Sequence, residues 1–243
     1  MDKWTKQDRI RRRYEAKMYR ALYKWINDDL RILKKESPEI ALAKLPTLFA
    51  WENLSTILQA NYEQMGQRSG TDAYTNVAND GTSIKRGVDF ISTIVQAIIR
   101  RIAGSRLLAA EIRNIPDNLR SEVRAILSNT VGEVLGAREI ASRLSAKFAR
   151  DRALRIARTE TTYMWNIAAE EGAKATGLRL EKVWLATNDA RTRDTHRQLD
   201  GQVVPVDADF VVNGKQMSKP GDPRGGAREV VNCRCAVEYR RVT

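Results

Sequence analysis

The hydrophobic residues of the chain recur at three- and four-residue steps over most of its first 176 positions, which is the spacing of helices with one buried face. The first run predicts a basic amphipathic helix over residues 1–36 that ends near Ser37-Pro38, because proline disfavours helical backbone in the residue before it. The apolar positions of this helix are Tyr14, Met18, Leu22, Trp25 and Ile26.

A second helix is predicted from Glu39 to about Met65, kinked or divided at Pro46, because proline lacks a backbone donor. Residues 66–81 are rich in Gly, Ser, Asn, Asp and Thr, a composition typical of loops. The sequence therefore predicts an irregular segment after this helix.

Further helical runs follow over residues 84–112, 117–135, 137–149 and 150–175. In residues 84–102, isoleucines and valines alternate steps of four and three, a heptad-like seam that faces one neighbouring helix. Pro116 is expected to end that run, and Gly177 is expected to close the last one.

After Gly177 the pattern becomes that of short strands, at Leu180–Leu185, Gln202–Val204, Phe210–Val212 and Ala236–Tyr239. Asn213-Gly214 predicts a hairpin after the third of these, because both residues accept the positive φ of a type I′ turn. We expect an α+β fold, with a mostly helical N-terminal region over residues 1–115 and a small C-terminal α+β domain with a short antiparallel sheet over residues 116–243. Within that domain, helices are expected over residues 117–176 and the mixed part over residues 178–243.

Lysine and arginine number 42 against 30 aspartates and glutamates, which gives a formal net charge of +12. Residues 1–35 alone carry twelve basic and five acidic side chains, a balance that suits a polyanionic partner. We expect this segment to bind the phosphates of double-stranded DNA without reading sequence, through Arg9, Arg11, Arg12, Arg13 and Lys17. The alternative is a solvated basic face over an ordinary packing stripe. A membrane-spanning helix needs about 20 apolar residues in a row, so no membrane anchor is expected.

The single histidine excludes sites that need a histidine pair, and two cysteines are too few for a secreted disulfide scaffold. Charged and ligand-forming side chains concentrate in residues 189–201 and 232–235. One interpretation is a zinc site formed by His196, Cys233 and Cys235. Its fourth ligand would be Asp189, Asp194, Asp200 or Asp222. The competing interpretation is a histidine that hydrogen-bonds within a loop beside small buried cysteines.

Two other arrangements fit the same residues. A thiol nucleophile activated by His196 is disfavoured, because no glycine-rich oxyanion turn surrounds the cysteines. We favour a lattice of ion pairs that fixes the loop, since arginine can hold a carboxylate with two parallel hydrogen bonds. Its members would be Arg158, Glu160, Asp189, Arg191, Arg193 and Asp194. We therefore expect no catalytic residue and no cofactor, with structural zinc as the alternative.

The order and spacing of these motifs resemble the minor head proteins of tailed phages, known as the Mu F-like or SPP1 gp7-like head morphogenesis family. The resemblance covers roughly residues 115–240. It is carried by Arg158-Thr159-Glu160, Asn166, Trp184, Asp189, Arg191-Thr192-Arg193, His196, Leu199-Asp200-Gly201, Pro220-Gly221-Asp222-Pro223 and the run from Glu229 through Asn232 to Cys233-Arg234-Cys235.

The resemblance implies a minor capsid protein of the virion, bound at the portal vertex inside the head, that assists procapsid assembly and DNA packaging or ejection. The implied partners are the portal protein, the major capsid or scaffolding protein and packaged double-stranded DNA, with assembly in the host cytoplasm. No enzymatic activity is implied for the domain, and we expect the chain not to be an enzyme, because its sequence ends at Thr243, soon after Cys235. The alternatives are a sequence-nonspecific DNA-binding accessory protein and a small hydrolase or metalloenzyme that uses His196 and the cysteines.

Overall fold

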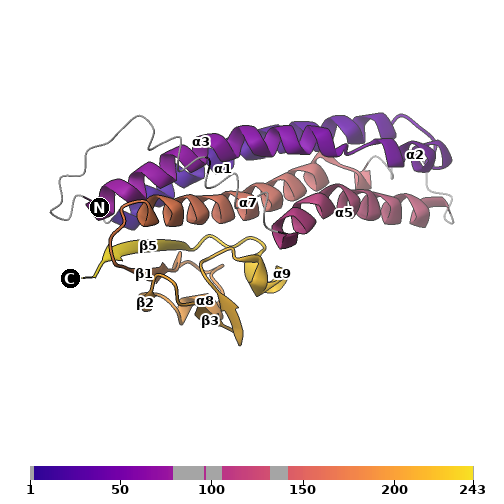
Figure 1. Ribbon diagram of the computed structural model, residues 1–243. Coiled ribbons are helices and arrows are strands. Elements are labelled where there is room, and N and C mark those ends of the chain that lie inside the picture. Colours follow the sequence, from indigo (N-terminus) through magenta and orange to yellow (C-terminus); the bar gives the residue numbers. More distant parts are fainter. Residues whose placement is uncertain (1–2, 79–95, 97–105, 132–141, 243) are drawn as a thin grey trace.

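The computed structural model describes residues 3–78, 96, 106–131 and 142–242. Figure 1 shows long helices stacked side by side, with the strands gathered beneath one half of them. The C-terminal part carries a short antiparallel sheet, so the predicted α+β fold class is confirmed.

The predicted N-terminal amphipathic helix is α1 (Lys3–Leu33). Its fully buried positions include Met18, Leu22 and Ile26, spaced four residues apart on one face. The next helix, α2 (Pro38–Lys44), begins after Ser37, whose side chain accepts a hydrogen bond from the Ile40 amide. The boundary near Ser37-Pro38 is therefore where the sequence predicts it.

The helix predicted after Glu39 is divided at Pro46, as expected. This proline lies in the 3₁₀ turn η1 (Leu45–Thr47), which separates α2 from α3 (Trp51–Ala78). The loop predicted over residues 66–81 is wrong in its described part, because α3 continues to Ala78. Small residues bring α3 close to α7: a Cβ added to Gly172 would lie 2.0 Å from the Gly70 carbonyl oxygen. Gly70 therefore serves the packing of the two helices.

The helix α5 (Arg106–Val131) continues through Pro116, so the predicted helix end at this proline is wrong. Proline removes one backbone hydrogen bond, and the burial of Pro116 together with Leu119, Val123 and Leu127 offsets that loss. The boundary proposed between residues 115 and 116 lies inside this helix. The seam over residues 84–102 lies outside the described residues apart from Gln96, and residues 132–141 also lie outside them.

The central helix is α7 (Ala146–Lys174), which packs against α1 and α3 on one side and against the sheet on the other (Figure 1). The helix predicted over residues 137–149 is interrupted at Leu144-Ser145 in its described part. Every residue from Glu160 to Glu170 is buried, as expected for a helix covered on both sides. Gly177 follows with a φ of 69°, which agrees with its predicted role as the closing glycine.

The middle strand of the sheet is β1 (Leu180–Leu185), which pairs antiparallel with β2 (Val203–Pro205) and β5 (Ala236–Arg241). The predicted hairpin is confirmed as β3 (Phe210–Val212) and β4 (Lys215–Met217), with φ of 50° at Asn213 and 75° at Gly214. The connecting segments contain the short helical turns α8 (Asp194–Arg197), η2 (Pro223–Gly225) and α9 (Ala227–Val230).

The helical core contains residues from both sides of position 115, including Leu54 of α3 and Met164 of α7. A separate cluster under the hairpin contains Trp184, Phe210 and both cysteines. Val77, Ala173 and Tyr239 connect α3, α7 and β5 in a third cluster. Among the described helices, none has a stretch that is both long and apolar enough to cross a bilayer.

Candidate functional site

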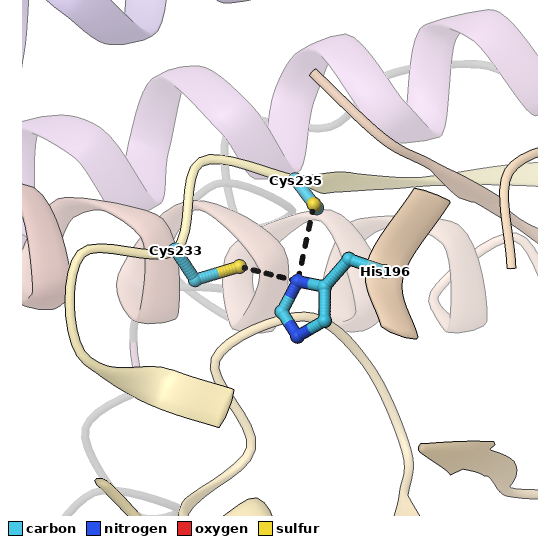
Figure 2. A group of neighbouring side chains, drawn as sticks. All are labelled: His196, Cys233 and Cys235. Carbon is cyan, nitrogen blue, oxygen red and sulfur yellow. Dashed lines mark hydrogen bonds between the residues drawn. The ribbon is translucent and has the colours of Figure 1, made fainter. Parts of the chain in front are cut away.

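The only histidine and both cysteines of the chain meet beneath the sheet. His196 lies in α8, and the cysteines lie in the segment directly before β5. The Cys233 and Cys235 sulfurs are 3.6 and 3.5 Å from His196 Nδ1, and Figure 2 shows both directed at that nitrogen. The three side chains are 1–2% exposed, and the Trp184 ring packs edge-on against the imidazole at 5.3 Å. The sequence grouped these residues correctly.

Glu229 completes this cluster from the other side of the imidazole. Its Oε2 atom lies 3.2 Å from His196 Nε2, although Nε2 has no well-aligned hydrogen-bond partner among the described residues. The carboxylate also accepts hydrogen bonds from Thr195 and Asn213. Burial opposes its ionisation, but these hydrogen bonds and the nearby His196 leave the pKa of Glu229 below its usual value. Glu229 is not predicted as a member of the site from the sequence, although it stands only four residues before Cys233.

The two thiols differ in acidity. A hydrogen bond from the Cys235 side chain lowers the pKa of Cys233 despite the burial of its thiol. The same contact and burial raise the pKa of Cys235 well above its usual value. Cys233 is therefore the more acidic of the two thiols.

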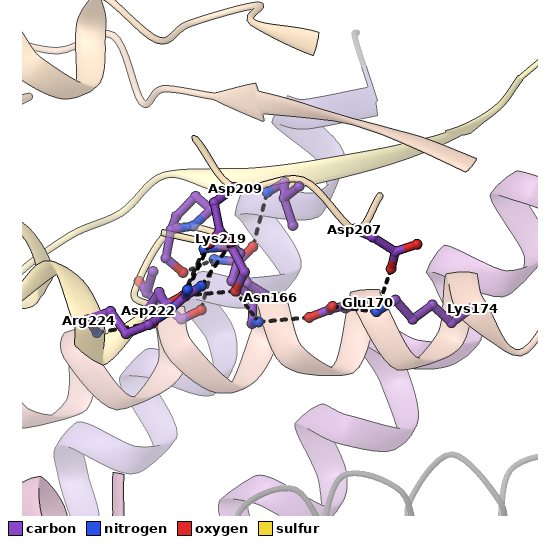
Figure 3. Close-up of polar contacts among 12 residues, drawn as sticks. Asn166, Glu170, Lys174, Asp207, Asp209, Lys219, Asp222 and Arg224 are labelled. Atoms are coloured by element: carbon purple, nitrogen blue, oxygen red, sulfur yellow. Dashed lines mark hydrogen bonds and ion pairs between the residues drawn. The ribbon is translucent and has the colours of Figure 1, made fainter. Parts of the chain in front are cut away.

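A stripe of polar side chains on α7 anchors the cysteine segment. Thr162 donates to the Cys233 carbonyl at 2.6 Å, and Asn166 donates to the carbonyls of Pro220 and Cys235 at 3.0 and 3.3 Å. One turn later, Glu170 binds Lys219 at 2.7 Å in an ion pair with both partners buried (Figure 3). Residues four apart lie on one face of a helix, so α7 presents this stripe to the loops of the small domain.

The predicted ion-pair lattice is not formed as expected. Arg158 binds Glu15 of α1, and Glu160 accepts a hydrogen bond from Tyr62 of α3, so both side chains face the N-terminal helices. Helix periodicity explains the error, because it does not show which neighbour a given face of α7 meets.

The loop members of the lattice have other partners. Arg193 donates to the Val231 carbonyl, Asp194 binds Arg197, and the exposed Arg191 lies 4.0 Å from Asp189. The bidentate partner of Asp189 is Arg234, whose guanidinium holds the pKa of that carboxyl well below its usual range. The sequence does not indicate that Arg234 is the partner of Asp189, because Arg234 stands between the two cysteines, 45 residues away.

The remaining motif residues shape the backbone. Asn232 has a φ of 60°, and its amide donates to Thr159 of α7. Gly201 has a φ of 79°, and its amide donates to the Trp184 carbonyl. The Asp222 carboxylate caps η2 by accepting from the Arg224 amide. All three positions hold turns around the histidine–cysteine cluster.

A comparison with known protein families shows which family contains this chain. The model of the phage Mu protein F-like family matches residues 94–238, which is more than half of the chain. The chain belongs to this family. The resemblance to phage head morphogenesis proteins that the sequence predicts is thereby confirmed.

Two relatives of this phage Mu F-like chain come from Bacillus and one of its phages. The minor head protein GP7 of Bacillus phage SPP1 is 38% identical over 73 residues, which cover 30% of this chain and 23% of that relative. The uncharacterized protein YqbB of Bacillus subtilis (strain 168) is 29% identical over 134 residues, which cover 53% of this chain and 43% of YqbB. No solved structure matches the chain.

A third relative corrects the expectation that this chain is not an enzyme. It is a protein of Enterococcus faecalis (strain ATCC 700802 / V583) named NAD(+)–arginine ADP-ribosyltransferase EFV, and it is 36% identical over 152 residues. The match covers 60% of this chain and 30% of that relative. A relative that covers 60% of this chain is thus named as an enzyme, which contradicts the prediction. The chain spans less than half the length of each of these relatives.

The predicted DNA-binding residues of this phage Mu F-like chain do not all reach solvent. Arg11 is 2% exposed and donates to Asp8 at 2.6 Å and to Thr162 at 2.8 Å. Its assignment to a DNA-binding surface is therefore wrong, because its guanidinium lies between α1 and α7. The other candidates, Arg9, Arg12, Arg13 and Lys17, are exposed.

The exposed face of α1 carries a basic stripe opposite its buried face. We define the basic stripe as Arg9, Arg13, Lys17, Arg20, Lys24 and Arg31. Steps of three, four and seven place these residues on one side of the helix. Asp28 binds Lys24 and approaches Arg31, so it neutralises part of the far end of the stripe.

A cleft of about 390 Å³ lies between α5, α7 and α9. Arg152, Arg155, Glu122 and Glu160 contribute charged groups to its lining, beside apolar side chains such as Ile115. Arg152 and Glu122 form an ion pair at its wall. The cleft is within the size range of small-molecule sites.

Proposed function

We propose that this chain is a minor head protein of a tailed phage, located in the virion at the portal vertex inside the head. In this role it assists procapsid assembly and the packaging or ejection of DNA. Membership of the Mu F-like family supports the proposal, as does the similarity to the minor head protein of phage SPP1. The proposed partners are the portal protein, the major capsid or scaffolding protein and packaged DNA.

The basic stripe of α1 is the observation that supports the proposed contact with DNA. From Arg9 to Arg31 it extends over about 33 Å, at a rise of about 1.5 Å per residue. B-form DNA presents one phosphate charge per about 1.7 Å of its axis, and the stripe is about as long as one turn of the duplex. Contacts of this kind neutralise phosphates and carry no sequence information.

The DNA contact is tested by salt-dependent retention of a double-stranded probe by the full chain. The test variant replaces Arg9, Arg13, Lys17 and Arg20 of the stripe with glutamine and leaves the buried Arg11 in place. A control variant replaces the exposed Arg150, Arg179, Arg228 and Arg241 and so removes the same charge elsewhere. We expect only the first variant to lose binding and to flatten the dependence on salt. Equal loss in both variants contradicts a specific role for α1.

Portal association is tested by co-purification of the full chain with the portal protein of the same phage. Retention of this chain on immobilised portal protein at physiological salt is expected. If portal protein retains no more of this chain than an unrelated phage protein of similar charge does, the proposed location at the portal vertex is wrong.

A second candidate function is transfer of ADP-ribose from NAD⁺ to an arginine side chain, with release of nicotinamide and a proton. The name of the enterococcal relative suggests this function, and the charged cleft is a place for such a substrate. The test incubates the full chain with NAD⁺ and a guanidine acceptor and measures free nicotinamide. Release that is lost in Glu122→Gln, and kept in the exposed-site control Glu63→Gln, supports the activity. Absence of release from the full chain rejects it.

A further inference from the structure

The histidine–cysteine cluster has the geometry of a metal site. We propose that His196 Nδ1, Cys233 Sγ and Cys235 Sγ bind one Zn²⁺ ion that holds the small domain together. All three donor atoms lie within 4.8 Å of one another, and each comes from a buried side chain. The mixed nitrogen and sulfur set is one that zinc accepts in tetrahedral sites.

The two nitrogen–sulfur distances agree with the edges of a zinc tetrahedron. Zinc binds imidazole nitrogen at about 2.1 Å and thiolate sulfur at about 2.3 Å, so a tetrahedral site separates nitrogen from sulfur by about 3.6 Å. The two sulfurs lie 3.6 and 3.5 Å from Nδ1. Both nitrogen–sulfur edges therefore already have the length that a bound zinc ion requires. Three protein ligands leave the fourth position for a water molecule.

The side of the imidazole opposite Nδ1 faces a carboxylate. The carboxylate of Glu229 faces Nε2, which favours a proton on that nitrogen and a lone pair on Nδ1. One Zn²⁺ ion would bind this lone pair together with both sulfurs. A carboxylate on the far side of a metal-binding imidazole is the usual arrangement that orients such a ligand.

The surrounding structure holds the ligands in place without a metal. Hydrogen bonds from Thr162 and Asn166 of α7 fix the carbonyls of Cys233 and Cys235. Arg234, between the two cysteines, turns away toward Asp189, so both sulfurs point to the same side. Zinc would connect this segment to α8, and the two thiolates would cancel the charge of the ion in a buried site. Each thiol gives up its proton to solvent when the ion binds, so two protons are released for each Zn²⁺ ion.

The test measures metal content and ligation in the full chain, purified without a polyhistidine tag. We expect one zinc ion per chain by elemental analysis. Replacement of that zinc by Co²⁺ should give the charge-transfer absorption of cobalt–thiolate bonds. Cys233→Ser and Cys235→Ser should each lose most of the bound zinc. Glu229→Gln should still bind zinc, about 10- to 100-fold more weakly.

Asp200→Asn is the matched control for this experiment. Asp200 is in the same loop region but binds the Ala186 amide and Asn188, outside the group of donor atoms. It should therefore keep its full zinc content. If zinc persists in both cysteine variants, the assignment of ligands is wrong.

A measurement on the unaltered chain keeps the proposal testable where a cysteine variant does not fold. The chain is stripped of metal by a chelator, and its melting temperature is measured with added Zn²⁺ or Mg²⁺. Zinc alone should raise the melting temperature, because an ion that binds only the folded state stabilises that state. A folded chain that takes up neither zinc nor cobalt would falsify the site.

Discussion

The buried side chain of Asn166 hydrogen-bonds four backbone groups, which no apolar side chain could do. Its amide nitrogen donates to the carbonyls of Thr162, Pro220 and Cys235, and its amide oxygen accepts from the Val237 amide at 3.0 Å. The side chain is fully buried, so water cannot take over these bonds. One residue thus connects α7, the Pro220 turn and β5.

Asn166→Ala should therefore lower the free energy of unfolding by about 3 kcal/mol or more, because each buried group left unpaired costs about 1–3 kcal/mol. Urea denaturation followed by tryptophan fluorescence measures the change. The control is Asn53→Ala on the exposed side of α3, which should change stability by about 0.5 kcal/mol at most. Similar small losses in both variants would show that the Asn166 network adds little.

Lys182 places a charged group inside the small domain. Its side chain is 1% exposed, and its Nζ lies 5.5 Å from the centre of the Phe210 ring. Burial is the main cause that lowers the pKa of Lys182 from 10.5 to about 8. Glu170 and Asp209 raise this pKa, whereas Lys219 and Lys174 lower it.

The sign of the resulting pH dependence follows from proton binding. Between pH 8 and 10.5 the unfolded chain keeps the Lys182 proton while the folded chain loses it, so stability rises with pH over this window. Lys182→Met should remove that rise and increase the free energy of unfolding at neutral pH. Urea titrations at several pH values measure the slope, with the exposed Lys147→Met as the control. An unchanged slope in Lys182→Met means that the buried amine keeps its usual pKa.

At the residue scale, the sequence predicts which side chains lie close together, whereas their hydrogen-bond and ion-pair partners are known only from the structure. The lone histidine and the Cys-x-Cys pair were grouped correctly because they are rare residues in one short domain. The partners of Arg11 and Asp189 could not be predicted, because Thr162 and Arg234 are distant in sequence and come close only when α7 packs against both α1 and the small domain.

At the scale of elements, the contact between α3 and α7 depends on paired glycines. A Cβ on Gly172 would lie 2.0 Å from the Gly70 carbonyl oxygen, so the two helices can pack this closely only without that atom. Close packing here also places Ser69, which donates to the Trp165 carbonyl at 2.8 Å.

Gly172→Ala should destabilise the chain by about 1–3 kcal/mol or more, because the two backbones must separate to admit the methyl group. Thermal unfolding followed by circular dichroism measures this change. Gly177→Ala is the contrast, since open space surrounds its Cβ position and only the cost of its positive φ, about 1–2 kcal/mol, applies. A Gly172→Ala variant as stable as the unaltered chain would show that α3 and α7 separate without cost.

The strands and the hairpin could be predicted because their signals are local. Asn213-Gly214 specifies its own turn, and short runs with valine and aromatic residues indicate β1 and β5. Residues 66–78 and Pro116 gave wrong predictions because their local signal, a loop or a helix end, is overridden by packing. The small residues of α3 are buried against α7, and Pro116 is buried in α5.

At the scale of the whole molecule, α7 belongs to two layers at once. Trp165 lies 6.4 Å from the Tyr14 ring of α1, measured between ring centres, while Asn166 beside it binds the cysteine segment and β5. Arg11 continues this link, since it donates to Thr162, which in turn donates to Cys233. The small domain and the N-terminal helices are therefore connected through one helix.

This shared helix predicts how a shortened chain behaves. Residues 116–243 expressed alone would keep α7 but lose α1 and α3, so Tyr163, Met164 and Ile167 would lose the helical core that buries them. We expect that fragment to lack the near-ultraviolet circular dichroism of the full chain, to bind a hydrophobic dye and to unfold without a sharp urea transition. Addition of residues 1–115 as a separate chain should restore the spectrum, because it supplies the missing faces of α1 and α3. A fragment 116–243 that unfolds cooperatively alone, with the native spectrum, would instead establish it as an independent domain and make the packing of α1 and α3 against α7 dispensable for its fold.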